Sequence, residues 1–240
     1  MIDQSRSAAV TRLTLNRPDR LNAFTGDGYK ALRLGVQQAS ADPETRVIVI
    51  TGRGRAFSAG ADRSLLDGSA SEAARHTVGT EFRAMLGAID QCRKPIIAAV
   101  NGLAVGIGCT LLLHCDLVVM AESARLRLPF TALGIVPEAG SSVLLPARTR
   151  WPDALWAMLS SEWIDSAEAY GMGLVWRVVP DDRVVYEAEH AAATLAALDP
   201  VSVEATKHLL MEGRRDAVEA ALDRESDLMT ALMNRKLGRS

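Results

Sequence analysis

One long run without a charged residue, residues 95–113, constrains the fold of this chain more than any other feature. Such a run suits either a membrane span or a buried core. Asn101-Gly102 and Gly106-Ile107-Gly108 interrupt it and break a helix into strand, turn and strand. The run therefore predicts the interior of a folded domain, without attachment to a membrane.

The segments around this run alternate between strand and helix patterns. Residues 9–15 and 96–100 are predicted strands, and residues 46–51 form a nearly continuous β-branched run, as in a strand covered on both faces. Residues 25–42 and 71–90 are predicted helices. This alternation indicates an α/β fold with parallel strand pairing.

The second half becomes mainly helical. We expect a helix over 106–114, short strands over 116–120 and 125–128, and a helix beginning at residue 138 and continuing to 146. Residues 1–198 are predicted to form the core, and residues 199–240 a helical segment that packs on itself or on another subunit. Its last helix carries an apolar stripe of Val218, Leu222, Leu228 and Leu232, which favours subunit packing over membrane attachment.

Composition excludes several classes of protein. Of 240 residues, 48% are hydrophobic and 23% charged, which is ordinary for a globular protein and argues against intrinsic disorder. The net charge of −2 disfavours nucleic acid as a partner. Three cysteines without a C-x-x-C pair argue against disulfides and structural zinc, and for a reducing cytoplasmic setting. The histidines have no metal-like spacing, so we expect no metal site.

Two loops carry backbone amides suited to binding an anion. Residues 56–62 follow a buried strand and are mostly small, and residues 101–109 turn a strand into a helix whose first amides are free. One amide from each loop, converging on one oxygen, would form an oxyanion hole. The alternative is that small residues only permit tight packing. The glycine spacing matches neither a dinucleotide-binding loop nor a P-loop.

Several motifs in order resemble the crotonase, or enoyl-CoA hydratase/isomerase, superfamily. They are Leu-Thr-Leu-Asn-Arg-Pro at 13–18, Leu-Asn-Ala at 21–23, Ile-Thr-Gly at 50–52, Phe-Ser-Ala-Gly-Ala-Asp at 57–62, Lys-Pro-Ile-Ile-Ala-Ala-Val-Asn-Gly at 94–102, Val-Gly-Ile-Gly at 105–108, Cys-Asp at 115–116, Leu-Gly-Ile-Val-Pro at 133–137 and a last match over 167–179. The resemblance implies a spiral of ββα turns, a C-terminal helical oligomerisation segment, homotrimers or dimers of trimers, and an acyl-CoA substrate. It implies no cofactor beyond the coenzyme A that the substrate carries.

The resemblance also assigns binding roles. The thioester oxygen would accept hydrogen bonds from the backbone amides of Ala61 and Ile107. Coenzyme A would lie along the backbone near Leu21, Ala23, Ala59 and Ala61. Arg17, Arg20 and Arg63 lie near these segments and suit its phosphates or, equally, the solvent. Asp62 borders the site, although it is also placed to cap a helix that begins at Arg63.

The acidic residues distinguish branches of the superfamily. Hydratases use two glutamates, and Thr110 and Phe130 occupy the matching positions here. Neither side chain can act as a carboxylate base. The segment Val-Pro-Glu-Ala-Gly-Ser-Ser at 136–142 instead resembles the single-acid enoyl-CoA isomerases, which implies Glu138 as the catalytic acid and base. Apolar neighbours such as Phe130 would raise its pKa.

Alternatives remain for these assignments. Glu138 could merely favour the dipole of a helix as a first-turn glutamate. The chain could be a hydratase that uses Glu138 alone, or a non-catalytic acyl-CoA-binding protein. His114 is expected as a satisfied core histidine, Cys109 and Cys115 as inert buried thiols, and the tryptophans in the core or at subunit contacts: Trp151, Trp156, Trp163 and Trp176.

Overall fold

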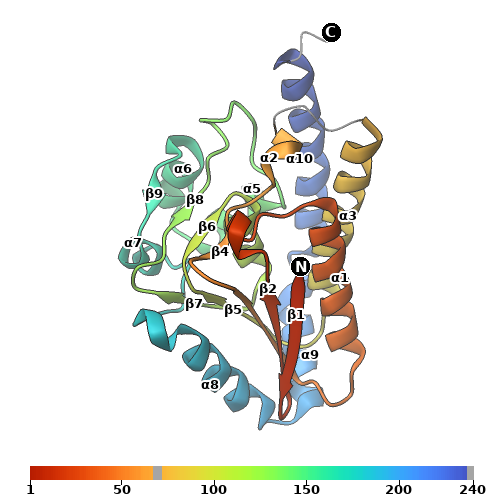
Figure 1. The fold of residues 1–240 in the computed structure, drawn as a ribbon, viewed down its shortest axis with the longest axis vertical. Helices are drawn as coiled ribbons and strands as arrows, with labels where there is room; N and C mark the ends of the chain where they lie inside the picture. The colour runs from red at the N-terminus through yellow and green to blue at the C-terminus, as the bar shows by residue number, and fades with distance from the viewer. Residues whose placement is uncertain (67–71, 237–240) are drawn as a thin grey trace.

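The fold is built around one large twisted sheet, seen in the computed structural model, which describes residues 1–66 and 72–236 (Figure 1). Its strand order is β1-β2-β3-β5-β7-β10. The hairpin β1–β2 is antiparallel, and every other neighbouring pair is parallel. The strands are β1 (Ile2–Ser7), β2 (Val10–Leu15), β3 (Val47–Gly52), β5 (Ile96–Val100), β7 (Leu117–Ala121) and β10 (Arg177–Val179).

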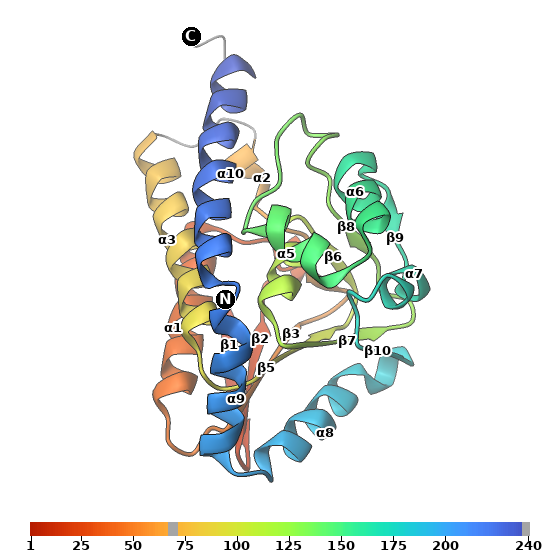
Figure 2. The same cartoon turned by 180° about the vertical axis from the view of Figure 1, so that it is seen from behind.

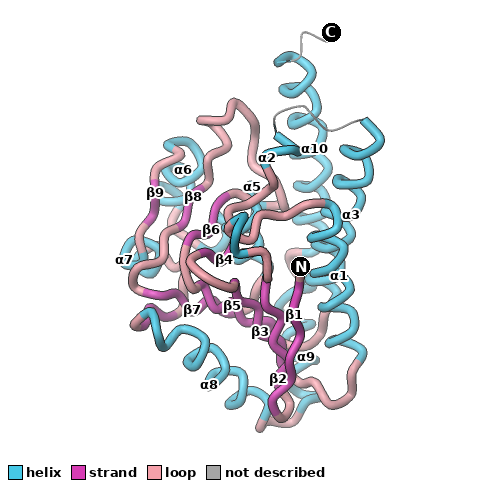
Figure 3. The backbone as a smooth tube through the Cα atoms, viewed as in Figure 1, coloured by secondary structure: helices cyan, strands magenta, loops and turns pink. Residues whose placement is uncertain are grey.

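A second, smaller sheet lies against the ends of these strands and carries the two small-residue loops (Figure 3). Its order is β4-β6-β8-β9, with the first three strands parallel and the last pair antiparallel. The chain passes repeatedly from the large sheet to the small one and back through a helix, which is a ββα spiral. The strands are β4 (Ala56–Ser58), β6 (Leu103–Val105), β8 (Leu126–Arg127) and β9 (Trp163–Ile164).

Helices cover the sheets on separate sides. In Figures 1 and 2, α1, α3 and α10 run side by side along one flank, α8 lies beneath the large sheet, and α6 and α7 cover the opposite flank. The helices are α1 (Gly26–Ala41), α2 (Arg63–Leu66), α3 (Glu72–Gln91), α4 (Ile107–Thr110), α5 (Ser141–Arg148), α6 (Trp151–Ser160), α7 (Ser166–Gly171), α8 (Val184–Ala196), α9 (Pro200–Glu212) and α10 (Arg215–Lys236), with 3-10 turns at Pro18–Arg20, Leu111–His114 and Asp181–Arg183.

The core is continuous across both sheets and includes the uncharged run. β3 and β5 are buried along almost their whole length, as expected for central parallel strands covered on both faces. The apolar residues that surround them come from α1, α3, α8 and the 3-10 turn at Leu111–His114. Among residues 1–66 and 72–236, no helix has both the length and the apolar character needed to cross a bilayer. The α/β class with parallel pairing is confirmed.

Several predicted elements need correction. The hairpin strand β1 was not predicted, because its polar residues form an exposed edge. The helix expected over 106–114 is a short α-helix, Ile107–Thr110, followed by a 3-10 turn. The helix expected from residue 138 begins only at Ser141. Ala139 and Gly140 have φ of 61° and 66°, which a right-handed helix does not admit.

The C-terminal region consists of α9 and α10. Its separation from the core at residue 199 stays a prediction. Within the apolar stripe of α10, Val218 is buried and Leu222 packs on the core, whereas Leu228 is 57% exposed. The role of this stripe in subunit packing stays a prediction. Residue 71, where the helix over 71–90 was expected to begin, and residues 237–240 of the C-terminal segment lie outside the described residues.

Candidate active site

A cavity of about 370 Å³ lies where the two small-residue loops meet α3, α10 and the segment before α5. Its walls are mainly apolar, and its polar groups are few, as in binding sites for apolar acyl groups. The described residues that line it are Tyr29, Ala59, Gly60, Ala61, Val78, Gly79, Phe82, Val105, Gly106, Ile107, Pro129, Phe130, Leu133, Ile135, Glu138, Ala139, Leu222, Glu225, Ser226, Met229, Thr230 and Met233.

Glycine allows the two loops to come together. Gly60 has φ of 92°, and a Cβ there would lie 2.6 Å from the carbonyl oxygen of Val105. A Cβ on Gly108 would lie 2.2 Å from the carbonyl oxygen of Ser58. Any larger residue at either position would push the loops apart. The backbone contact explains why both loops are rich in small residues.

The amides of Ala61 and Ile107 are available to a ligand. Phe24 pairs with this segment through its neighbours: its amide donates to Gly60, and its carbonyl accepts from Asp62. The Ala61 amide therefore points the other way. Ile107 begins α4, so its amide has no partner within the helix. In the described part of the chain, neither amide donates to a protein acceptor. Both residues line the cavity.

Glu138 lines the same cavity as these amides and lies in the loop before α5. It is half-buried, and its Oε1 accepts a hydrogen bond of 2.7 Å from the Thr110 hydroxyl. Burial raises the pKa of Glu138 to about 7; the Thr110 hydrogen bond opposes this rise, and the charge of Glu225 adds to it. The suggestion that Glu138 is a first-turn glutamate of a helix is wrong, since it precedes Ser141.

Aromatic side chains form the wall opposite the loops. Tyr29 stacks on Phe24 with ring centroids 5.1 Å apart and meets Phe82 edge-on at 5.4 Å. Phe130 is buried in the same wall. Burial, and to a lesser degree the charge of Glu138, raise the pKa of Tyr29 well above its ordinary value, so its hydroxyl stays protonated. These rings give the cavity an apolar surface that suits an apolar ligand.

The predicted site residues divide into two groups. The cavity brings together Ala59, Ala61, Ile107, Phe130 and Glu138. Leu21, Ala23, Asp62 and Arg63 do not line it. Leu21 nevertheless adjoins the site, because its carbonyl accepts from the Ala59 amide at 2.8 Å. The contacts expected between these four residues and coenzyme A stay predictions.

Asp62 has a structural task of its own. Its Oδ2 lies 2.6 Å from Nη1 of Arg17, and its Oδ1 accepts from the amide and hydroxyl of Ser64 at the start of α2. The hydrogen bond from Arg17 lowers the pKa of Asp62. Arg17 also donates to the carbonyl of Ala23. Asp62 thus caps α2, as the sequence suggested, and binds Arg17.

The other candidate residues are placed outside the cavity. His114 is buried, with both ring nitrogens satisfied, and Cys109 and Cys115 are buried free thiols whose pKa burial raises to about 12. These expectations are confirmed. The tryptophans were expected in the core or at subunit contacts, and the structure excludes the core: the exposed fractions are 66%, 67%, 38% and 43% for Trp151, Trp156, Trp163 and Trp176. Their place at subunit contacts stays a prediction.

Sequence reasoning missed the walls contributed by α1, α3 and α10. Tyr29, Phe82 and Met229 sit on helix faces that look like ordinary core positions. Glu225 could have been recognised from the sequence as an unusual buried carboxylate. It follows Val218 and Leu222 at the spacing of a helical stripe, so a carboxylate replaces an expected apolar residue.

The comparisons with known proteins agree with this geometry. The family model described as enoyl-CoA hydratase/isomerase matches residues 5–239. The chain is 37% identical over 228 residues to the 2,3-dehydroadipyl-CoA hydratase of Escherichia coli strain K12, covering 95% of this chain and 88% of that protein. It is 31% identical to the 1,2-epoxyphenylacetyl-CoA isomerase of the same strain, covering 91% of this chain and 84% of the relative.

A solved structure supports the same relationship at the level of the fold. The enoyl-CoA hydratase/isomerase from Pseudoalteromonas atlantica T6c superposes with a TM-score of 0.90 at 35% identity, covering 100% of this chain and 98% of that one. The predicted crotonase-like ββα spiral is therefore confirmed. The chain belongs to the crotonase superfamily and is an enzyme of the enoyl-CoA hydratase/isomerase family.

Proposed function

We propose that this enzyme is an enoyl-CoA isomerase that moves a double bond of an acyl-CoA thioester from the 3 to the 2 position. Glu138 serves as base and then acid, and the amides of Ala61 and Ile107 bind the thioester oxygen. One observation carries the proposal: among the described residues that line the cavity, Glu138 is the one carboxylate not bound to backbone amides, and two free amides line the same cavity. Glu225, the other carboxylate of the wall, is occupied by two backbone amides.

The proposed reaction needs one proton carrier. Hydrogen bonds from Ala61 and Ile107 draw electron density onto the thioester oxygen and make the C2 hydrogen acidic. The Glu138 carboxylate removes that hydrogen as a proton, and the electron pair of the C2–H bond forms a dienolate. Glu138, now a carboxylic acid, returns the proton to C4. The C2–C3 double bond forms, the C3–C4 double bond is lost, and atoms and charge balance.

The environment of Glu138 suits both steps. A carboxyl group whose pKa is near 7 is a stronger base than one in water and still gives its proton back near neutral pH. Thr110, which stands where the resemblance places a hydratase glutamate, donates a hydrogen bond to the acid. Phe130, at the second such position, contributes apolar surface to the cavity. Both departures therefore serve a site with one acid.

A second candidate function is hydration of a 2-enoyl-CoA, with Glu138 alone activating water. Two relatives favour it, the E. coli 2,3-dehydroadipyl-CoA hydratase and the probable enoyl-CoA hydratase of Rhodobacter capsulatus, at 37% and 36% identity. Incubation with 2-enoyl-CoA separates the two. The isomerase proposal predicts slow hydration at most, whereas rapid loss of the conjugated absorbance would favour the hydratase.

The test of the isomerase proposal is Glu138→Gln. Isomerisation of 3-enoyl-CoA should fall by about 100-fold to 10,000-fold, the range for loss of a general acid–base residue, while affinity for the thioester stays close to wild type. Glu219→Gln is the matched control, because it removes an exposed carboxylate from α10. Isomerisation by Glu138→Gln at the wild-type rate would refute the proposal. Thioester binding without turnover by the wild-type protein would instead support the non-catalytic alternative.

We also propose that the protein assembles as a homotrimer or a dimer of trimers. The support is apolar surface that a single subunit leaves exposed on α6 and α9: Trp151, Leu155, Trp156, Leu159, Val201, Leu209 and Leu210. Light scattering coupled to size exclusion should give three or six times the 25.8 kDa of one chain. A monomer at micromolar concentration would contradict this assembly.

A further inference from the structure

The carboxylate of Glu225 is buried beside the loop that carries Glu138. It lies on α10 with only 6% of the residue exposed. Oε2 accepts from the Gly140 amide at 2.7 Å, and Oε1 accepts from the Ser142 amide at 2.9 Å. Hydrogen bonds to a charged acceptor are about twice as strong as neutral ones. Glu225 therefore connects α10, near the end of the chain, to the segment that carries Glu138.

We call residues 138–142 the acid loop; they comprise the loop before α5 and the first two residues of that helix. Its conformation needs such support. Ala139 and Gly140 both adopt left-handed backbone angles, and this region costs a residue with a Cβ such as Ala139. A Cβ on Gly140 would lie 3.1 Å from Cγ1 of Val218 on α10. The loop thus packs against α10 at the point where Glu225 binds its amides. Without Glu225, the amides of Gly140 and Ser142 would lose the acceptor that they bind here.

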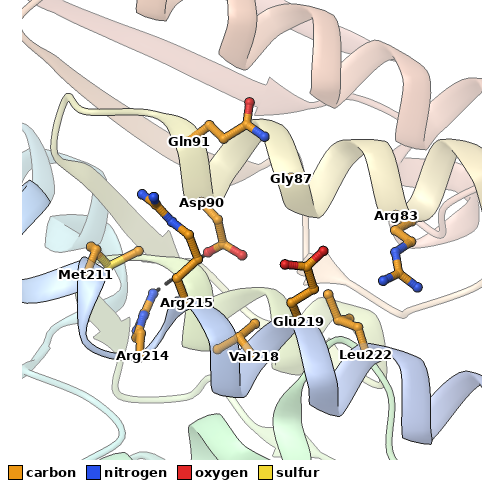
Figure 4. A pocket seen from close by; sticks show the side chains of 10 residues that line it. All are labelled: Arg83, Gly87, Asp90, Gln91, Met211, Arg214, Arg215, Val218, Glu219 and Leu222. Carbon is orange, nitrogen blue, oxygen red and sulfur yellow. Dashed lines mark ion pairs between the residues drawn. The ribbon is translucent and has the colours of Figure 1, made fainter.

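A second buried side chain, His114, binds a neighbouring backbone group of the same loop. Nε2 of His114 lies 2.7 Å from the carbonyl oxygen of Ala139, so it donates a hydrogen bond there. Nδ1 lies 2.9 Å from Oδ1 of Asp90 on α3. Arg214 lies 3.8 Å from the same carboxylate oxygen, in the pocket between α3 and α10 (Figure 4).

Asp90 is an ionised partner in this arrangement. Burial alone would raise its pKa, but the hydrogen bond from His114, together with the charges of His114, Arg214 and Lys207, brings the pKa of Asp90 below its ordinary value. A carboxylate that orients a histidine ring is a common way of fixing the direction of the other ring nitrogen. Because a carboxylate and a carbonyl oxygen both accept, the two bonds form together only when both ring nitrogens of His114 carry a hydrogen, and Asp90 is then the negative partner that orients the ring toward Ala139.

We propose that Glu225 and His114 are positioning residues for Glu138: they bind the backbone of the residues that directly follow it and hold its carboxylate toward the reacting carbons. Neither residue exchanges a proton with the substrate: both oxygens of Glu225 accept from backbone amides, and His114 does not line the cavity. The inference rests on the proposed role of Glu138. It adds that the acid half of the site is assembled by α10 and the Leu111–His114 turn.

Glu225 also acts through its charge. The groups that face Glu138 from the surrounding elements are Thr110 and Cys109 on α4, Tyr29 on α1 and Glu225 on α10. Burial is the largest cause of the raised pKa of Glu138, and the negative charge of Glu225 adds to it. Loss of that charge lowers the pKa of Glu138.

Glu225→Gln tests both effects. The kcat for 3-enoyl-CoA should fall by about 10-fold to 100-fold, the cost of misplacing a catalytic group by about 1 Å, with KM nearly unchanged. The acidic limb of the kcat–pH profile should move to lower pH. Glu225→Asp keeps the charge but is one methylene shorter, so it should lower kcat and leave that limb in place. Glu219→Gln removes an exposed charge from the same helix and should change neither.

The outcomes separate this inference from the proposed function. Loss of activity in Glu138→Gln together with a wild-type kcat and pH profile in Glu225→Gln would overturn the positioning role and leave the isomerase intact. A lowered melting temperature of Glu225→Gln with wild-type kcat would overturn it as well, since the role would be only structural. Wild-type activity in Glu138→Gln would overturn both. His114→Gln should reproduce the fall in kcat without moving the acidic limb as far as Glu225→Gln does.

Discussion

The two halves of the candidate site are built in different ways. The amide half, around Ala61 and Ile107, consists of backbone from two neighbouring strands brought together by Gly60 and Gly108. The acid half is one side chain, Glu138, whose loop is bound by residues distant in the sequence, such as Glu225. The amide half depends on glycines that have no side chain, whereas the acid half depends on buried charged side chains.

This difference decides how each half tolerates substitution. A backbone site fails when a Cβ separates the loops, whatever the chemistry of the new side chain. A side chain held by a network fails gradually, as individual hydrogen bonds are removed. Substitutions in the amide half should therefore abolish activity abruptly, and those behind the acid half should reduce it in steps.

The largest effect is expected for Gly60→Ala. The new Cβ would lie 2.6 Å from the Val105 oxygen, at a φ of 92° that alanine rarely adopts. We expect at least about a 100-fold loss of kcat/KM, the scale for losing an oxyanion-hole donor, and about 1–3 kcal/mol of stability. Steady-state kinetics and urea unfolding measure the two effects.

Gly87→Ala is the control for this substitution. Gly87 lies within α3, and a Cβ there would meet only the Gln91 side chain, at 4.0 Å. Because alanine favours a helix, the variant should be about 0.5–1 kcal/mol more stable than wild type, with unchanged kinetics. If Gly60→Ala behaved like Gly87→Ala, close loop contact would not be needed for the amide half.

A second prediction concerns the stability cost of Glu138. Its folded pKa of about 7 exceeds the ordinary value of 4.5, so its contribution to stability is full below pH 4.5 and is lost as pH rises toward 7. Glu138→Gln has no such titration. The variant should be more stable than wild type at pH 8 by up to about 3 kcal/mol, with little difference at pH 4.5. Denaturant unfolding at both pH values measures this, and an equal difference at both would contradict a raised pKa.

The smallest effect is expected for Asp90→Asn, a substitution of the residue that binds His114 and does not contact the acid loop directly. The change removes the carboxylate that orients His114, while the bond from His114 to Ala139 can still form. A hydrogen bond of this kind contributes about 1 kcal/mol, so kcat should fall about fivefold with KM unchanged. A loss above about 100-fold would mean that the acid half is as intolerant as the amide half.

The meeting of the two small-residue loops could be predicted from the sequence because its determinants are local. Glycines and small residues after a buried strand identify both loops, and the structure places Ala61 and Ile107 in one cavity. The central strands were equally clear, since an uninterrupted β-branched run such as residues 47–51 is legible without knowledge of its neighbours. The polar edge strand β1 has no such pattern and was missed.

The acid half could be predicted only in part. The family resemblance singled out Glu138, but its position was predicted to begin a helix. The left-handed angles of Ala139 and Gly140, which delay that helix to Ser141, have no clear signal in the local sequence. Glu225 lies 87 positions after Glu138, and nothing local connects them. Long-range hydrogen bonds to backbone leave little trace in a single sequence. The one local indication was Glu225 itself, a carboxylate at a position of the apolar stripe of α10.

The central claim is that Glu138 carries a proton to and from carbon while two amides hold the oxygen. Exchange of the C2 hydrogen in D2O tests it most directly, because exchange reports proton removal even when the double bond does not move. The account predicts that the wild-type enzyme incorporates deuterium at C2 of a bound acyl-CoA and that Glu138→Gln, at equal thioester occupancy, does not. Equal rates of deuterium incorporation by the two proteins would contradict it.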